Sequence, residues 1–223
     1  VLDTLSFSGA LAGAAELANK LIGEDQTFDD ICFALKKFAD STHILFALAS
    51  FDNLAKNGRV NRVVGFIAGR LNMRVLGRRT PDGKIDFYFK TRGETRVLAK
   101  ILEQMDEDKY DGVHPVLISE CGNQNAAQLL HHGIEAKWPG APVKIVPCSG
   151  LCSFYAQDQG IRVTVFGDGE LFPFSQFPGE AAVPAFARQN GNAVRSRYQD
   201  STRFVQYPGM VLSNGMRDQE VDG

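Results

Sequence analysis

The sequence lacks most of the features that would place it in a familiar functional class. None of its apolar runs approaches the roughly 18 residues of a membrane helix, and its first residues contain no basic region followed by an apolar signal core. We therefore expect a soluble, cytoplasmic chain without a transmembrane segment. The phosphate loop Gly-x-x-x-x-Gly-Lys-Ser/Thr and the nucleophile elbow Gly-x-Ser-x-Gly are both absent, which argues against a nucleotide-consuming enzyme and a serine hydrolase.

Cysteine and histidine are scarce, with four of each. Cys148 and Cys152 have three residues between them rather than the two of redox and zinc motifs. Cys32 and Cys121 lie in apolar patterns, where cysteine acts as a small hydrophobe. We expect four free, buried thiols, no metal and no cofactor. The histidines lack partners at the spacing of a metal site or a triad, so the sequence nominates no catalytic residue.

Negative charge is nearly missing from one stretch. Lys56 to Lys100 contains twelve Lys or Arg against three acidic residues, a charge of +9, while the remaining residues carry 12 basic against 23 acidic side chains. This polarity predicts an anionic partner. An acidic protein surface, a phosphorylated ligand and nucleic acid are all open at this point, although the stretch has no recognisable nucleic-acid-binding signature.

The remaining pattern alternates apolar runs with helical periodicity, which predicts an α/β fold. A Pro81-Asp82-Gly83 turn between two strands predicts a hairpin, so we expect a mixed β-sheet layered with helices. The strands are expected at residues 1–5, 43–50, 73–79, 84–90, 115–121, 143–147 and 161–166. The helices are expected at residues 9–22, 28–39, 51–56, from 60 onward, 94–105, 125–138 and 151–157.

Local signals fix several of these elements. Thr27 and Asp30 have the spacing of a capping box, with Asp in the acidic role. Asn57-Gly58 is typical of a helix end. The helix after Thr27 is expected to bury one face, which consists of Phe28, Ile31, Cys32, Leu35 and Phe38. The helix from Val60 carries Gly65 and Gly69 four residues apart, which would leave a smooth patch for a ligand or another backbone.

Several segments, in the correct order, resemble the second half of the DegV family, which is similar to the fatty-acid-binding subunit of bacterial fatty acid kinase. They are Val1–Ser8, Leu54–Val60, Gly69–Leu76, Lys90–Arg92 and Gly150–Ala156. The resemblance covers residues 1–169. It implies that residues 1–42 are the last strand and helix of a first α/β lobe and that 43–169 are the DegV-like C-terminal domain. Residues 170–223 are expected to form a Pro/Gly-rich tail, and its role is unknown from the sequence.

The resemblance also implies a function. The chain would not itself be an enzyme but would bury a long-chain fatty acid and present its carboxylate to a partner kinase subunit, for acyl phosphate formation in phospholipid synthesis. The expected lipid-binding residues are Phe66, Ile67, Leu71, Ser149, Leu151, Ser153 and Phe154. The expected kinase-binding residues are Arg59, Arg62 and Arg92.

The sequence departs from the family at the polar end of the ligand. The family's carboxylate-binding serine and threonine belong to the first domain and have no counterpart here, and its C-terminal histidine falls about where this chain has Phe154. Two alternatives stay open. One is a polyanion- or nucleic-acid-binding interaction module that uses residues 56–100, and the other is an enzyme of the dihydroxyacetone kinase type, which the missing nucleotide loop disfavours.

Overall fold

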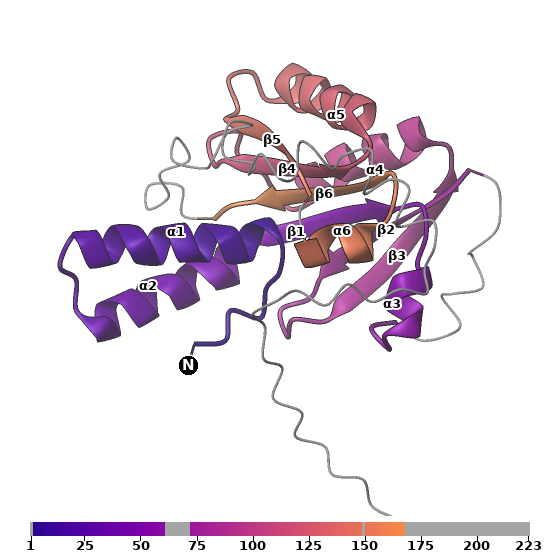
Figure 1. Ribbon diagram of the computed structural model, residues 1–223. Coiled ribbons are helices and arrows are strands. Elements are labelled where there is room, and N and C mark those ends of the chain that lie inside the picture. The colour runs from indigo at the N-terminus through magenta and orange to yellow at the C-terminus, as the bar shows by residue number, and fades with distance from the viewer. Residues whose placement is uncertain (1, 61–71, 149, 168–223) are drawn as a thin grey trace, which may run out of the picture. The chain divides into compact units, whose positions relative to one another are not determined.

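Six strands form one mixed sheet in the order β3-β2-β1-β6-β4-β5 (Figure 1). The computed structural model describes residues 2–60, 72–148 and 150–167. Strands β4 and β5 pair in parallel, and the other neighbouring pairs are antiparallel. The strands are β1 His43–Leu48, β2 Met73–Arg79, β3 Ile85–Arg92, β4 Val116–Cys121, β5 Val143–Pro147 and β6 Gly160–Val165. The expected mixed α/β architecture is confirmed.

The two kinds of pairing follow from the connections. Strands β2 and β3 are joined by the predicted Pro81-Asp82-Gly83 turn, in which Gly83 takes φ +77° and donates its N–H to Thr80 O at 2.9 Å. Such a short turn can join only antiparallel strands. Strands β4 and β5 are instead connected through α5 (Gln124–Lys137), a crossover long enough for parallel pairing.

One face of the sheet is covered by α4 (Glu94–Glu107) and α5 (Figure 1). Alternate residues of the central strands point toward these helices, as the two-residue period of a strand requires. The core between them contains the fully buried side chains Leu76, Ile101, Val116, Ile118, Leu130, Ile134 and Val163. This is the larger apolar core of the fold, and it lies away from the predicted ligand residues on α6.

The opposite face carries α1 (Gly9–Gly23), α3 (Asp52–Lys56) and α6 (Gly150–Ala156). Helix α6 contacts both α3 and β6. The apolar cluster on this face consists of Ala10, Ile44, Phe46, Leu48, Phe51, Leu54, Val75 and Ala156. Here the sheet is covered by the two short helices α3 and α6 and by the start of α1, whose Ala10 belongs to the cluster.

Helices α1 and α2 (Phe28–Ser41) pack on each other and on the end of the sheet. Phe38 and Phe166 stack with ring centroids 5.9 Å apart, and Leu17 and Leu117 complete the buried cluster. Thr27 caps α2 as predicted, because its Oγ1 accepts the Asp30 N–H at 3.2 Å. The proposed division of the chain at residue 42 stays a prediction.

Three local expectations were wrong. Residues 2–5 form no strand, and Leu2 and Leu5 are exposed, because no strand of the described sheet runs beside them to accept their hydrogen bonds. Phe28 is 77% exposed, since α2 contacts the core through its far end at Phe38. The four cysteines are free as predicted, but each is only partly buried.

Among the described helices, none has the length and apolar character needed to cross a bilayer.

Candidate functional site

Helices α3 and α6 are tied together by side-chain contacts on the sheet face that they share. Asn53 of α3 donates from Nδ2 to the backbone O of Phe154 at 2.8 Å. Ser50, just before α3, donates from Oγ to Gln157 Oε1 at 3.1 Å, just after α6. Two segments about 100 residues apart in the chain are therefore held side by side above the sheet.

Beneath these helices lies an aromatic cluster, in which Phe46 and Phe51 are at most 3% exposed. The Phe46 and Phe87 rings meet edge to face with centroids 5.6 Å apart, and Phe51 meets Phe87 in the same way at 4.8 Å. Phe7 adds a further edge contact to Phe46 at 6.1 Å. Rings in this arrangement offer large apolar area with little conformational freedom. The cluster is apolar and brings no acid–base group to this face of the sheet.

Three of the predicted ligand residues lie on α6. Leu151 is 70% exposed, whereas Ser153 and Phe154 are partly buried. The Phe154 and Tyr155 rings meet edge to face, with their centroids 5.1 Å apart. An exposed leucine on a short helix that covers an aromatic cluster is available for a further apolar contact.

The other predicted site residues divide into two groups. Arg59 follows α3 and Arg92 ends β3, and both are exposed. The remaining ones lie outside the described residues: Phe66, Ile67, Leu71, Ser149 and Arg62.

Arg162 is a buried charged residue that the sequence reasoning did not single out. It lies in the middle of β6 and is only 5% exposed. Its Nη2 donates to the backbone O of Cys152 at 2.7 Å and to Cys148 Sγ at 2.8 Å, so it connects the sheet to the first turn of α6. The available signal was a lone arginine between Ile161 and Val163 in an otherwise apolar strand, because a buried charge is rarely tolerated without a purpose.

The thiols of Cys148 and Cys121 are protonated at neutral pH. Burial raises the pKa of Cys148 to about 11, and burial also raises the pKa of Cys121. Since the thiolate is the nucleophile and the metal ligand, neither thiol is activated. In the part of the chain that the structure describes, no group of His, Cys, Asp or Glu could hold a metal ion.

A polar network holds the loop after α6. Arg74, 8% exposed, donates from Nη2 to Gln159 Oε1 at 2.5 Å and to Glu94 Oε2 at 3.4 Å. The same Glu94 oxygen accepts from Asn123 Nδ2 at 2.5 Å, and Asn123 Nδ2 also reaches Gln159 O at 3.3 Å. The network fixes where α6 ends by joining β2, α4 and the loop after β4.

The basic residues of the 56–100 stretch differ in their ion pairing. Near the hairpin turn, Arg78 pairs with Asp86 at 3.2 Å and Lys84 with Asp82 at 2.7 Å. A second set forms no ion pair with any described residue: Lys56, Arg59, Lys90, Arg92 and Arg96. These five, called the unpaired cations below, lie at the end of α3 or just after it, at the end of β3, or in the first turn of α4.

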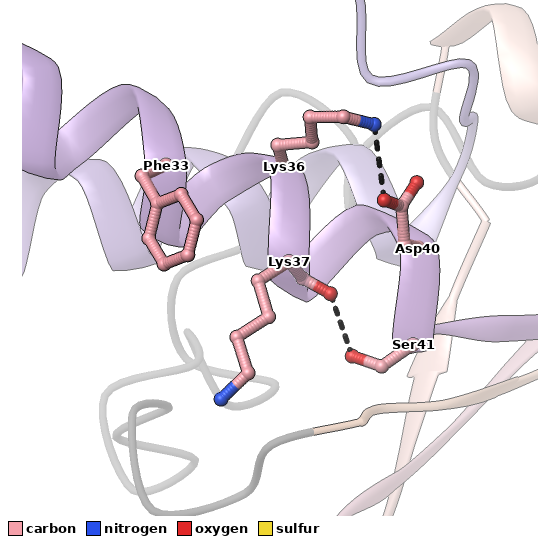
Figure 2. A pocket seen from close by; sticks show the side chains of 5 residues that line it. All are labelled: Phe33, Lys36, Lys37, Asp40 and Ser41. Carbon is pink, nitrogen blue, oxygen red and sulfur yellow. Dashed lines mark hydrogen bonds and ion pairs between the residues drawn. The ribbon is translucent and has the colours of Figure 1, made fainter.

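A separate hollow of about 550 Å³ lies on α2 and is lined by Phe33, Lys36, Lys37, Asp40 and Ser41 (Figure 2). Lys36 pairs with Asp40 at 3.0 Å, and Ser41 Oγ donates to the Lys37 O at 2.9 Å. All five residues belong to one helix, so the hollow is open to solvent. The hollow does not coincide with the aromatic cluster beneath α3 and α6.

A family model described as uncharacterised proteins of the DegV family matches residues 1–165. A DegV domain-containing protein of Streptococcus gordonii is 34% identical over 161 residues, which are 72% of this chain and 57% of that protein. A DegV domain-containing protein of Streptococcus pneumoniae is 33% identical over 161 residues, again 72% of this chain and 57% of that protein. The chain thus spans less than two thirds of the length of these relatives.

Solved structures give the same result. The fatty acid kinase B3 protein of Streptococcus pneumoniae, loaded with linoleic acid, is 32% identical with a TM-score of 0.68, over 74% of this chain and 58% of that one. A Eubacterium eligens DegV protein loaded with heptadecanoic acid is 28% identical with a TM-score of 0.69, over 74% and 59%. The described sheet and helices are therefore similar to those of proteins that hold fatty acids.

Proposed function

The chain belongs to the DegV family, and on that premise we propose that it contributes the C-terminal part of a binding site for a long-chain fatty acid. The observation that carries the proposal is the aromatic cluster beneath α3 and α6, in a fold similar to two fatty-acid-loaded proteins. Burying an acyl chain against such a surface is favourable by about 0.8 kcal/mol per methylene.

The proposed acyl-facing side chains are those predicted from the sequence: Phe66, Ile67, Leu71, Leu151 and Phe154. Ser149 and Ser153 are proposed to lie near the polar end. In support, Leu151 is exposed on α6, and Asn53 donates a hydrogen bond to the backbone of Phe154. We propose no cofactor, because the ligand is bound rather than transformed by this chain.

Titration of the delipidated 223-residue chain with oleate tests this function. The expected result is saturable heat release and, in native mass spectrometry, one added oleate mass. Oleate binding to Leu151→Asp should be weaker than to Leu129→Asp, a control at an exposed leucine on α5 on the opposite face. Absence of both the heat and the added mass in the unmutated chain would rule the function out.

We further propose that this chain is a non-catalytic partner of a fatty acid kinase subunit, which phosphorylates the carboxylate. Arg59, Arg62 and Arg92 are the proposed contacts. The support is the set of unpaired cations, whose charge is not neutralised by described residues and is available to an acidic protein surface. If the chain alone formed acyl phosphate from fatty acid and ATP, the non-catalytic role would be contradicted.

The same unpaired cations favour a second candidate, a polyanion- or nucleic-acid-binding module. Ionic strength separates the two. Polyanion binding weakens steeply with added salt because counterions are released, whereas burial of an acyl chain hardly responds to salt. Oleate affinity that is constant from 50 to 300 mM NaCl, with no retention of single-stranded DNA, is the outcome expected from our proposal.

A further inference from the structure

Two cysteines lie side by side where β4 and β5 end. Cys121 is the last residue of β4, and Cys148 directly follows the last residue of β5. The parallel register pairs Glu120 with Pro147, and the Cys148 N–H donates to Glu120 O at 2.7 Å. The ladder of hydrogen bonds therefore extends to Cys148, and the next pair across the two strands is Cys121 with Cys148.

The spacing and direction of these two side chains suit a disulfide, although both thiols are free in the structure. Hydrogen-bonded strands lie about 4.8 Å apart, and the Cα atoms of a disulfide are about 4.4–6.8 Å apart. Residues that pair across a sheet point to the same face, and both cysteines pack against the apolar cluster that contains Phe46 and Ala156. The pKa of Cys148 is raised mainly by burial, and the thiol of Cys121 raises it further, as a close neighbour does.

Both sulfur atoms are also connected to α6. Arg162 Nη2 donates to Cys148 Sγ at 2.8 Å, and the same nitrogen donates to the backbone O of Cys152 at 2.7 Å. Cys121 Sγ donates a long hydrogen bond to the backbone O of Ser153 at 4.0 Å. The two thiols therefore contribute to holding the first half of α6 against the sheet.

A bond between the two sulfurs would release both of these contacts. Oxidation removes the thiol hydrogen that Cys121 donates to Ser153, and it draws Cys148 Sγ toward β4 and away from Arg162. Helix α6 has only seven residues, so its helical structure depends on contacts of this kind. Since α6 carries three of the predicted ligand residues, a looser α6 should hold an acyl ligand less tightly.

We propose that Cys121 and Cys148 form a redox site, in which a reversible disulfide loosens α6 and weakens binding of the acyl ligand. The oxidant is a small disulfide such as oxidised glutathione. One protein thiol loses its proton and displaces one glutathione thiolate to give a mixed disulfide, and the second protein thiol then displaces the other, so the oxidant is reduced to two glutathione molecules. Because burial keeps both thiols protonated at neutral pH, the exchange is slow. Only the effect on the ligand rests on the proposed fatty-acid function.

Prolonged incubation of the delipidated 223-residue chain with excess oxidised glutathione tests the disulfide. After alkylation under denaturing conditions, the intact mass should show two of the four thiols unmodified by the alkylating reagent, and dithiothreitol should restore all four. Cys121→Ala and Cys148→Ala should each abolish this internal disulfide, and either variant decides alone if the other does not fold. Cys152→Ala and Cys32→Ala are the controls and should form the disulfide as the unmutated chain does.

Oleate titration before and after oxidation tests the effect on the ligand. The oxidised chain should bind oleate several-fold more weakly than the reduced chain, and dithiothreitol should restore the affinity. Cys121→Ala, which cannot form the disulfide, should bind oleate equally before and after the same treatment. Cys152→Ala should respond to the oxidant as the unmutated chain does.

Several results would overturn the inference. Four alkylated thiols after oxidation, a disulfide that requires Cys152 or Cys32, or a disulfide between two chains would each show that Cys121 and Cys148 are not a redox pair. Equal oleate affinity of the oxidised and reduced chains would refute the effect on α6. Failure of the reduced chain to bind oleate would overturn the proposed function and the effect on the ligand, while the mass measurement would still decide whether the disulfide forms.

Discussion

At the scale of single residues, Gly13 sets how closely α1 approaches the core. A Cβ at this position would lie 2.7 Å from the Phe166 ring and 2.9 Å from the Phe38 ring, and both rings are fully buried. We expect Gly13→Ala to destabilise the fold by about 1–3 kcal/mol, because overpacking outweighs the better helix propensity of alanine. Gly23→Ala, with no atom within 4 Å, is the matched control and should be neutral or stabilising. Urea unfolding measures both, and equal stability of the two variants would contradict the packing.

Cys148 gives a second prediction at this scale. The folded thiol keeps its proton to about pH 11, whereas an unfolded thiol loses it near pH 8.5. Because the unfolded state binds fewer protons above that pH, the free energy of unfolding should fall as pH rises, by about 3 kcal/mol across the window. Measured by urea unfolding at pH 7.5 and 10.5, the free energy of unfolding should fall less for Cys148→Ala than for the unmutated chain. Cys32→Ala, on α2, is the control, and identical losses in all three would refute the assignment.

At the scale of elements, the helical structure of α3 and α6 is stabilised more by contacts between the two helices than by the helix propensity of either segment. Helices of five and seven residues are too short to be stable alone. Asn53→Ala removes the hydrogen bond to the Phe154 carbonyl and should cost about 1 kcal/mol, with weaker oleate binding because α6 is less firmly placed. Asn57→Ala removes a bond within the local chain only and is the control. Thermal unfolding and oleate titration measure both effects. If Asn57→Ala lowered the melting temperature and the oleate affinity more than Asn53→Ala, the coupling between α3 and α6 would be contradicted.

The same dependence explains what could be predicted of the elements. Capping at Thr27, the turn at Gly83 and the long periodic helices were predicted because their signals are local. A strand at residues 2–5 was wrongly predicted because an apolar run becomes a strand only when another strand pairs with it. Arg162 was not singled out because only the three-dimensional structure shows that it is buried and donates to Cys148 and Cys152. Sequence order also gave no reason to place β6 between β1 and β4.

At the scale of the whole molecule, charge is distributed unevenly around a nearly neutral total of −2. The paired cations near the hairpin turn are partly neutralised by Asp82 and Asp86, whereas the unpaired cations, which include Arg59 and Arg92, are not. Exposed ion pairs contribute little to stability. The stability of the fold therefore does not explain the five unpaired cations, which is why we propose that they contact an acidic partner.

Charge reversal distinguishes a docking surface from a merely basic one. Arg59→Glu combined with Arg92→Glu should abolish acyl phosphate formation by a DegV-associated kinase, because like charges at an interface are repulsive and slow association. Oleate affinity and melting temperature should be unchanged, since both side chains are exposed. Arg78→Glu combined with Lys84→Glu reverses the same number of charges near the hairpin turn and serves as the matched control. Equal loss of kinase coupling in both double variants would mean that net charge, rather than the unpaired cations, attracts the kinase.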